Sequence, residues 1–291
     1  MTSEPRELSL SKFRSASIAR LEAAGVVTAE VDTDLLIGSV LDLSRGEVQA
    51  KAIAGIPLSP EHEDELSQLV ERRAAREPLQ HITGVAYFRS LSLAVGPGVF
   101  VPRPETEQVA QYAIDALRAV PSAAPIAVDL GTGSGAIAFS LATEIPNALV
   151  YAVEISPDAF EWTVRNRERT GATNATLALG DLASAFTELD GIVDVVISNP
   201  PYIPNDAIPR DIEVQLHDPA TALYGGPDGL DVVRHVSTTG RRLLHAGGIL
   251  VIEHGELQAA AIAALLRADG WTAVATHRDL LGRDRATTAL R

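Results

Sequence analysis

Cysteine is absent from this sequence of 291 residues, and its absence excludes disulfide bonds and thiolate metal sites. No apolar run reaches the roughly 18 residues that a membrane span needs. The first residues, MTSEPRELSLSKFRSAS, contain no apolar segment of the kind found in secretory signals. We therefore expect a cytoplasmic protein with no membrane association.

Positive charge is also scarce, with 24 Lys and Arg against 38 Asp and Glu and a formal net charge of −14. Proteins that bind nucleic acid through its phosphates need clustered Lys and Arg, so this balance argues against such a protein. The best candidate for a local basic patch is the segment ERRAAREP, with Arg72, Arg73 and Arg76. The interpretation that we favour places these arginines in the last turn of a helix that Pro78 ends.

The length predicts two domains. Residues 1–78 have the apolar spacing of helices, and we expect a small helical bundle that packs on or recognises another molecule. In the second helix Asp32 is a candidate N-cap and Gly46 a candidate end. In the third helix Ser59 is the expected cap and Pro60 the first helical residue. The expected helices cover residues 9–26, 30–48 and 58–79.

A change of pattern follows at residues 79–101, LQHITGVAYFRSLSLAVGPGVFV. Alternating apolar residues around Gly84 and Ser90 predict a β-hairpin that links the two domains. A helix is expected to begin at about Pro104, within the second domain, residues 102–291.

From Ile126 onward, strand patterns alternate with helix patterns, and two short strands are expected at the C-terminus. Such alternation is typical of α/β proteins with a doubly wound, mostly parallel sheet.

The segment VDLGTGSGA follows the first of these strands and opens a helix, where α/β sheets bind nucleotides. Gly131 and Gly133 allow a tight turn and close approach of a ligand, and Gly135 relieves helix–strand contact. With Ala136 these glycines also fit the G-x-G-x-x-G/A dinucleotide fingerprint.

An acid is expected after the next strand to accept hydrogen bonds from a ribose, and Glu154 stands there. NAD and S-adenosylmethionine (SAM) both carry an adenosine ribose, so this pattern fits either cofactor. Asp181 ends the third strand, where an adenine amino group could be bound with Leu182 packed on the ring.

The fourth strand, IVDVVIS, ends in Asn199-Pro200-Pro201-Tyr202 at the same sheet edge. Hydride transfer has no evident use for this sequence, whereas methyl transfer to a planar NH₂ group does. The Asn199 side-chain oxygen and the Pro200 carbonyl could accept the two hydrogens of that group. The rigid prolines would fix their geometry in advance, and Tyr202 could stack on the planar group.

The motifs DLGTGSG and SNPPY resemble class I SAM-dependent methyltransferases that modify planar amino groups. Further stretches, REPLQHITGVAYF, VFVPRPETE, DGLDVVRHV and LVIEHGELQ, look like the PrmC/HemK family within that group, the N5-glutamine methyltransferases of peptide-chain release factors. The resemblance covers nearly the whole chain and implies a seven-stranded methyltransferase sheet, an N-terminal helical domain for the release factor, and a hairpin linker.

The same resemblance implies roles for individual residues. The release factor's Gly-Gly-Gln glutamine is the implied acceptor, SAM the methyl donor and S-adenosylhomocysteine the product. Apart from the resemblance, we expect no metal and a monomeric enzyme. The family often has an aromatic residue where Leu182 stands. The implied substrate-binding residues are Asn199, Pro200, Pro201, Tyr202, Phe100, Arg103 and Glu105, with Asn199 and Pro200 as the catalytic pair. The whole PRPETE stretch, residues 102–107, is implied to line the site beside them. The implied SAM-binding residues are Gly131, Thr132, Gly133, Ser134, Gly135, Glu154, Asp181, Leu182 and Asn199.

Three alternatives remain beside this interpretation. A DNA adenine methyltransferase would need a basic cleft and a region that reads the target, and the sequence has neither a basic nor an aromatic-rich insertion. A methyltransferase of another protein, such as a ribosomal protein, would carry the same Asn-Pro-Pro-Tyr. A non-catalytic SAM- or nucleotide-binding regulator would be favoured by loss of Asn199 or of a loop glycine, and none is lost.

Histidines beside acids raise the question of metal, but no pair has the spacing of a zinc helix. His62 is expected on a solvated helix face. His254 follows a strand at the ligand-binding edge, where it could shape the pocket.

Overall fold

The computed structural model describes residues 8–291, which divide into two compact units. The first unit runs up to Gly84 and also includes Arg210–His217, and the second consists of Val85–Pro209 and Asp218–Arg291. The helical region predicted from residue 1 onward therefore has its first seven residues outside the described part of the chain.

The first unit is a helical bundle. Its helices enclose an apolar core in which Leu10, Leu36 and Leu66 are fully buried. Ser59 caps α4 and Pro60 is its first residue, as predicted. Among residues 8–291, no helix combines the length and the apolar character needed to cross a membrane. The helices of this unit are α1 (Leu10–Ala23), α2 (Ala29–Leu41), α3 (Arg45–Ile53), α4 (Pro60–Ala74), α5 (Leu79–Thr83) and α9 (Ile212–His217).

The prediction of a single helix over residues 30–48 is wrong, because two helices occupy this stretch. Asp42 is left-handed (φ 52°) and ends α2, and Ser44 then opens α3 through a reciprocal capping box with Glu47. Asp32 is inside α2 rather than at its N-cap, and Gly46 is inside α3 rather than at a helix end. The apolar spacing continues through the break, and this continuity hides it from a reading of periodicity.

The three arginines near the end of α4 are engaged in ion pairs within the first unit. Arg72 pairs with Glu77, and Arg73 pairs with Asp32 at 2.7 Å. Glu213 of α9 receives hydrogen bonds from Arg73 at 2.9 Å and from Arg76 at 2.8 Å. Because each guanidinium has a carboxylate partner, these residues do not form a free basic patch.

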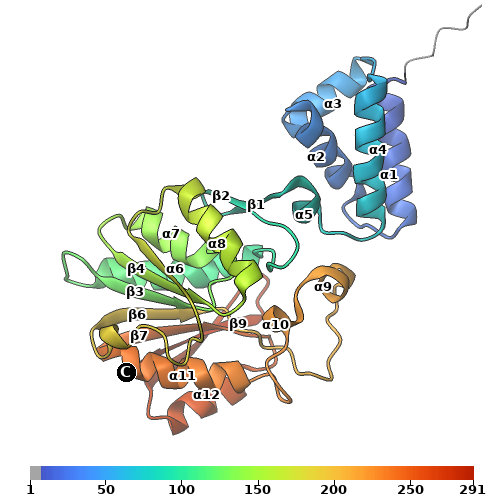
Figure 1. Cartoon of the computed structure of the whole chain (residues 1–291). Helices are drawn as coiled ribbons and strands as arrows, with labels where there is room; N and C mark the ends of the chain where they lie inside the picture. The colour runs from blue at the N-terminus through green and yellow to red at the C-terminus, as the bar shows by residue number, and fades with distance from the viewer. Residues whose placement is uncertain (1–7) are drawn as a thin grey trace, which may run out of the picture. The chain divides into compact units, whose positions relative to one another are not determined.

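The second unit is built on a seven-stranded sheet with the order β5-β4-β3-β6-β7-β9-β8 (Figure 1). The first five strands are parallel, and β9 is antiparallel to both of its neighbours. The predicted doubly wound, mostly parallel α/β sheet is thus confirmed, including the two C-terminal strands. The strands are β3 (Ile126–Leu130), β4 (Leu149–Glu154), β5 (Ala175–Leu179), β6 (Val193–Ser198), β7 (Leu244–Glu253), β8 (Thr272–Arg278) and β9 (Asp284–Leu290).

Helices cover both faces of this sheet: α6, α7 and α8 lie on one side, and α11 and α12 on the other (Figure 1). The strand residues alternate between the two cores, so that Ala127 faces α6 and α7 while Val128 faces the opposite layer. These elements are α6 (Pro104–Ala119), α7 (Ala136–Glu144), α8 (Pro157–Thr170), the 3₁₀ turn η1 (Thr187–Leu189), α10 (Ala220–Leu223), α11 (Asp231–Leu243) and α12 (Ala259–Ala268).

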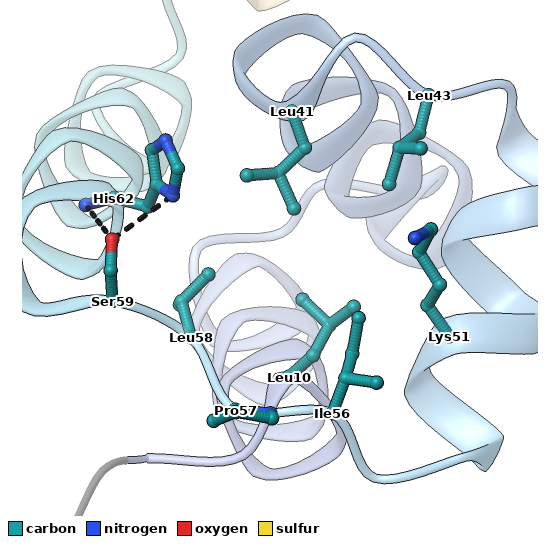
Figure 2. Close-up of a pocket in the computed structure, with 9 residues that line it drawn as sticks. All are labelled: Leu10, Leu41, Leu43, Lys51, Ile56, Pro57, Leu58, Ser59 and His62. Atoms are coloured by element: carbon teal, nitrogen blue, oxygen red, sulfur yellow. Dashed lines mark hydrogen bonds between the residues drawn. The ribbon is translucent and has the colours of Figure 1, made fainter.

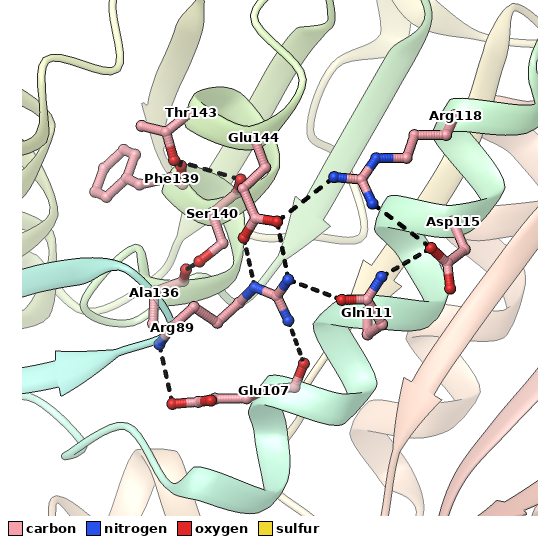
Figure 3. Close-up of polar contacts among 10 residues, drawn as sticks. All are labelled: Arg89, Glu107, Gln111, Asp115, Arg118, Ala136, Phe139, Ser140, Thr143 and Glu144. Atoms are coloured by element: carbon pink, nitrogen blue, oxygen red, sulfur yellow. Dashed lines mark hydrogen bonds and ion pairs between the residues drawn. The ribbon is translucent and has the colours of Figure 1, made fainter.

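The predicted hairpin consists of β1 (Val85–Phe88) and β2 (Leu91–Ala94). Its turn residue Arg89 has a left-handed backbone (φ 51°) and points its guanidinium between α6 and α7. As Figure 3 shows, Arg89 forms a bidentate pair with Glu144 of α7 and donates to the side-chain oxygen of Gln111 on α6 at 2.8 Å. The backbone N–H of Arg89 donates to the Glu107 carboxylate at 2.9 Å. One side chain therefore joins the hairpin to both helices.

We predict that Arg89→Ala lowers the free energy of unfolding of the second unit by about 2 kcal/mol, because several charge-assisted hydrogen bonds of partly buried groups are lost together. Denaturant unfolding followed by tryptophan fluorescence measures this, since both tryptophans, Trp162 and Trp271, belong to the second unit. Arg118→Ala is the matched control. Arg118 is half exposed and lies 3.7 Å from Glu144, so its loss should cost less than about 0.5 kcal/mol. Equal effects of the two changes would contradict the role given to Arg89.

Candidate active site

The sheet changes direction of winding between β3 and β6. The chain proceeds from β3 to β4 and β5 on one side, whereas β6 and β7 lie on the other. The loops after β3 and β6 therefore diverge at the carboxyl edge, where α/β sheets bind their ligands. The Ser198 hydroxyl at the end of β6 donates to the Leu130 carbonyl at the end of β3, at 2.6 Å. This bond fixes the glycine loop beside the Asn-Pro-Pro-Tyr segment.

The glycine loop uses positive φ at Gly131 (79°), Gly133 (57°) and Gly135 (84°). A Cβ added at Gly131 or Gly133 would meet no atom of the described chain within 4 Å, so these two positions leave open space for a ligand to approach the backbone. A Cβ at Gly135 would stand 2.0 Å from the Phe139 ring. The third glycine thus leaves room for the Phe139 ring of α7, the helix that it opens, whereas the sequence predicted that it relieves contact between helix and strand.

Helix α8 holds the loop from behind. The Thr163 hydroxyl donates to the Gly133 carbonyl at 2.6 Å, and the Asn166 amide donates to the Ser134 carbonyl at 2.9 Å. Asn166 also exchanges two hydrogen bonds with the backbone of Ala94 in the hairpin. The conformation of the loop is therefore set by fully buried side chains of α8.

Glu154 is the buried acid that ends β4. Its carboxylate accepts from the backbone N–H of Gly133 at 2.8 Å and of Ser156 at 2.9 Å. A carboxylate offers about four acceptor sites, so capacity remains for the hydroxyls of a ribose. The open sides of the loop glycines and this anchored acid fit the adenosine and methionine parts of SAM.

Asp181 and Leu182 follow β5, on the far side of β4. The Asp181 carboxylate is exposed and accepts from the Ala183 backbone N–H at 2.8 Å. Leu182 is half buried against the apolar layer that contains Val153. Both residues stand beside the end of β4, at the same edge as Glu154.

Asn199 continues β6 at the opposite side of the switch point. Its amide nitrogen donates to the hydroxyl of Thr106 on α6 at 3.4 Å. Pro200 is buried and Tyr202 is partly buried. The Gln258 amide donates to the Tyr202 carbonyl at 2.8 Å, which holds the segment after the prolines. Burial raises the pKa of the Tyr202 phenol to about 12, and the nearby Glu253 adds to that shift, so the ring stays neutral.

The residues predicted from the PRPETE stretch lie at the start of α6. The Arg103 guanidinium lies over the Phe100 ring, 5.1 Å from its centroid, and pairs with the buried Asp218 at 2.9 Å. Glu105 pairs with Arg283, in the turn between β8 and β9, at 3.1 Å. Through Thr106 this same turn of α6 reaches Asn199, so the stretch lies beside the Asn-Pro-Pro-Tyr segment.

His62 and His254 each have hydrogen-bond partners within the protein. His62 is exposed on α4, as expected, and its ring lies 3.0 Å from the Ser59 hydroxyl. His254 is fully buried, and its ring nitrogens contact the Gly255 carbonyl and the Thr287 hydroxyl. Burial lowers the pKa of His254, so this ring is neutral. Among residues 8–291 no group of three metal-ligating side chains comes together.

A separate pocket lies in the first unit, and Figure 2 shows its mostly apolar lining. None of the nine residues that form it is a predicted site residue. The lining residues are Leu10, Leu41, Leu43, Lys51, Ile56, Pro57, Leu58, Ser59 and His62.

Comparison with known proteins agrees with this geometry. A family model described as the PrmC N-terminal domain matches residues 14–84, and one described as a methyltransferase domain matches residues 123–278. The release factor glutamine methyltransferase of Streptomyces coelicolor is 46% identical over 275 residues, covering 93% of this chain and 94% of the relative. This chain belongs to the release factor glutamine methyltransferase family. It is a SAM-dependent methyltransferase, as the glycine loop and the resemblance implied.

Another relative of this family member has a different name. The 4-amino-L-phenylalanine/4-methylamino-L-phenylalanine methyltransferase of Streptomyces pristinaespiralis is 38% identical over 287 residues, covering 97% of this chain and 95% of the relative. Among solved structures, the catalytic domain of hMettl16 in complex with MAT2A 3'UTR hairpin 6 has a TM-score of 0.54 at 18% identity, covering 76% of this chain and 81% of that one. That likeness shows the shared methyltransferase fold.

Several buried polar residues at this family member's candidate site were not predicted. Thr163 and Asn166 support the glycine loop, and Glu253 ends β7 beside Asn199. Thr106, to which Asn199 donates, belongs to the PRPETE stretch that was expected to line the site. Asp129, at the end of β3, is fully buried and accepts from the Thr132 hydroxyl at 2.7 Å. Glu253 and Asp129 stood in the quoted motifs LVIEHGELQ and VDLGTGSGA, and a charged residue within an apolar strand was the signal that could have identified them.

Burial raises the pKa of Asp129 to about 7, against its ordinary 3.8, and outweighs the hydrogen bond from Thr132. Between those two pH values the folded protein binds more protons than the unfolded chain, so the free energy of unfolding falls as pH rises through this window. Asp129→Asn should remove that loss and stabilise the second unit at pH 8 by about 1–3 kcal/mol relative to wild type.

Denaturant unfolding at pH 5 and pH 8, followed by tryptophan fluorescence, tests this expectation. Glu168→Gln, an exposed acid in the last turn of α8, is the control and should leave the wild-type pH dependence in place. An identical change in stability between the two pH values for wild type and Asp129→Asn would contradict the prediction.

Proposed function

We propose that this enzyme transfers the methyl group of SAM to the side-chain amide nitrogen (N5) of the glutamine in the Gly-Gly-Gln motif of peptide-chain release factors. The observation that carries the proposal is the position of Asn199-Pro200-Pro201-Tyr202, bonded through Ser198 to the strand that opens the glycine loop. Membership of the family supports the choice of a release factor as substrate. S-adenosylhomocysteine is the second product, and the proposed reaction uses no metal.

The proposed SAM site consists of residues at the ends of β3, β4 and β5. Gly131–Gly135, including Thr132 and Ser134, would surround the methionine part, Glu154 would accept from the ribose, and Asp181 with Leu182 would bind adenine. When bound, SAM supplies an electrophilic methyl group on a sulfonium. Leu182 would give the adenine ring an apolar contact in place of aromatic stacking, so adenine binding here would depend on packing alone.

An amide nitrogen is a weak nucleophile because its lone pair is delocalised into the carbonyl. Accepting hydrogen bonds from both N–H groups at Asn199 Oδ1 and the Pro200 carbonyl would orient the amide and concentrate the lone pair on the reacting side. Both acceptors are fixed before the substrate arrives: Pro200 is buried, and Asn199 is bonded to Thr106. No general base is required, since the proton can leave after the methyl group is transferred.

The rest of the substrate pocket is assigned to residues around these acceptors. Pro201 and Tyr202 would contact the planar amide, while Phe100, Arg103 and Glu105 would line the site beside it. The stacking of Arg103 on Phe100 and the pair of Glu105 with Arg283 hold these side chains in defined positions.

We assign residues 1–78 to recognition of the release factor body, residues 79–101 to the linker, and residues 102–291 to catalysis. The proposed enzyme is a monomer of the cytoplasm that does not bind DNA. The pairing of Arg72, Arg73 and Arg76 with carboxylates supports the last point, because it leaves these guanidinium groups neutralised.

The Streptomyces pristinaespiralis relative suggests a second class of acceptor, because its name contains 4-amino-L-phenylalanine. An aromatic amine is also a planar NH₂ group, and the same two acceptors could orient it. That relative aligns over 97% of this chain, so the presence of the N-terminal helical unit does not distinguish the two acceptor classes, and they must be compared directly.

The deciding experiment incubates the purified protein with methyl-labelled SAM and separate acceptors: a release factor, the same factor with its Gly-Gly-Gln glutamine changed to alanine, duplex DNA, and 4-amino-L-phenylalanine. Label on the unchanged factor alone is the expected result. Label on both forms of the factor would move the reaction to another residue, and label only on DNA or on the amino acid would overturn the proposed substrate.

For Asn199→Ala we expect kcat to fall about 100-fold or more, because an interaction that orients the reacting nitrogen is lost. The affinity for SAM, measured by calorimetry, should stay within about threefold, since the glycine loop and Glu154 are untouched. A loss of SAM affinity as large as the loss of kcat would show that Asn199 serves cofactor binding instead.

A further inference from the structure

Glu253 is a buried acid that the proposed reaction does not use. It ends β7, and because Ser198 pairs with Ile252, the next residue of each strand, Asn199 and Glu253, emerge side by side at the carboxyl edge. Glu253 as a whole residue is 3% exposed. Within residues 8–291 its Oε2 has no hydrogen-bond partner. Burying a carboxyl in such surroundings costs free energy, so we expect a role that explains the acid at this position.

The neighbours of Glu253 indicate such a role. The Thr106 hydroxyl and the Asn199 amide stand beside its carboxyl and each lowers the pKa of Glu253, and Asn199 Nδ2 donates to the Thr106 hydroxyl at 3.4 Å. Three elements thus meet in one small network: α6 through Thr106, the end of β6 through Asn199, and the end of β7 through Glu253. Within residues 8–291, the hydrogen bond that the Asn199 side chain forms with Thr106 uses its amino end.

An ionised carboxylate can only accept hydrogen bonds, so it selects the amino end of a neighbouring carboxamide. The carbonyl end must then point the other way. A protonated carboxyl can donate as well, and it would compete for Asn199 Oδ1. The ionised form of Glu253 therefore defines which end of Asn199 is presented to the substrate.

We propose that Glu253, together with Thr106, is a positioning residue for methyl transfer, an inference that rests on the proposed function. Glu253 holds the amino end of Asn199 so that Oδ1 accepts from the substrate NH₂ group. Donation to a carboxylate also polarises the Asn199 amide and makes Oδ1 a stronger acceptor. Glu253 itself does not touch the reacting atoms in this arrangement.

The charges around Glu253 place its ionisation in the neutral range. Burial raises its pKa to about 7, and Glu105 adds to the rise, while Arg285 and the hydrogen bonds from Thr106 and Asn199 oppose it. The Tyr202 phenol faces the same carboxyl and stays neutral, and Arg283 pairs with Glu105. Since an acid loses its proton as pH rises, the fraction of correctly oriented Asn199 should increase through pH 7.

The test measures kcat from pH 6 to pH 8.5 for the full-length wild type, Glu253→Gln, Thr106→Val, Thr106→Ser and the control Glu168→Gln, with a release factor as acceptor. For wild type and the control we expect kcat to rise with an inflection near pH 7. Glu253→Gln keeps the shape but offers both a donor and an acceptor at every pH, so its kcat should be about tenfold lower at pH 8 and independent of pH.

Thr106→Val removes one partner of the Asn199 amino end and should lower kcat about fivefold, whereas Thr106→Ser keeps the hydroxyl and should restore at least half of the wild-type rate. SAM affinity should be unchanged in all variants. This pair also keeps the test decisive if Glu253→Gln fails to fold.

A Glu253→Gln enzyme with kcat within twofold of wild type and the same inflection would overturn the positioning role. So would a Thr106→Ser enzyme no faster than Thr106→Val. Failure of the proposed function looks different: the wild type itself would leave the release factor unlabelled. The same series would then be measured with whichever acceptor the wild type does methylate.

Discussion

The parallel pairing of β3 with β6 is the constraint on which the candidate site depends. It sets the glycine loop and the Asn-Pro-Pro-Tyr segment side by side, and the Ser198–Leu130 hydrogen bond fixes their register. A slip of β6 by one residue would reverse the face on which every side chain of the strand lies. Asn199 would then lose both Thr106 and the neighbourhood of Glu253, although no residue of the sequence had changed.

The parts of the site that a reading of the sequence predicted are those with a local signal. Glycines at a strand–helix turn and a Pro-Pro pair after a strand each specify a backbone path within a few residues. No local signal predicts that Asn199 meets Thr106 and Glu253, because these contacts form only after strands and helices far apart in the sequence have packed. The break at Asp42 is a different case: the capping box of Ser44 and Glu47 is a local signal for it, but the apolar spacing continues across the break and favours a single helix.

Two acids of this edge, Asp129 and Glu253, are fully enclosed, and burial raises the pKa of each to about 7. Neither has an ion-pair partner as close as those of the arginines in the helical unit. An apolar residue at either position would favour folding at neutral pH. Acids nevertheless occupy both positions. This follows a common pattern, in which residues kept for function lower the stability of the fold.

The course of the chain near α9 has an evolutionary consequence. Residues 210–217 group with the N-terminal helices, through Glu213 and its two arginines, although the chain on either side belongs to the catalytic unit. The two units are therefore interleaved in sequence, not arranged one after the other. A recombination event at residue 84 would deliver a catalytic unit carrying a short helix whose Glu213 had lost its two guanidinium partners. Exchange of the N-terminal unit as a module is thereby disfavoured, and the two units are expected to be inherited together.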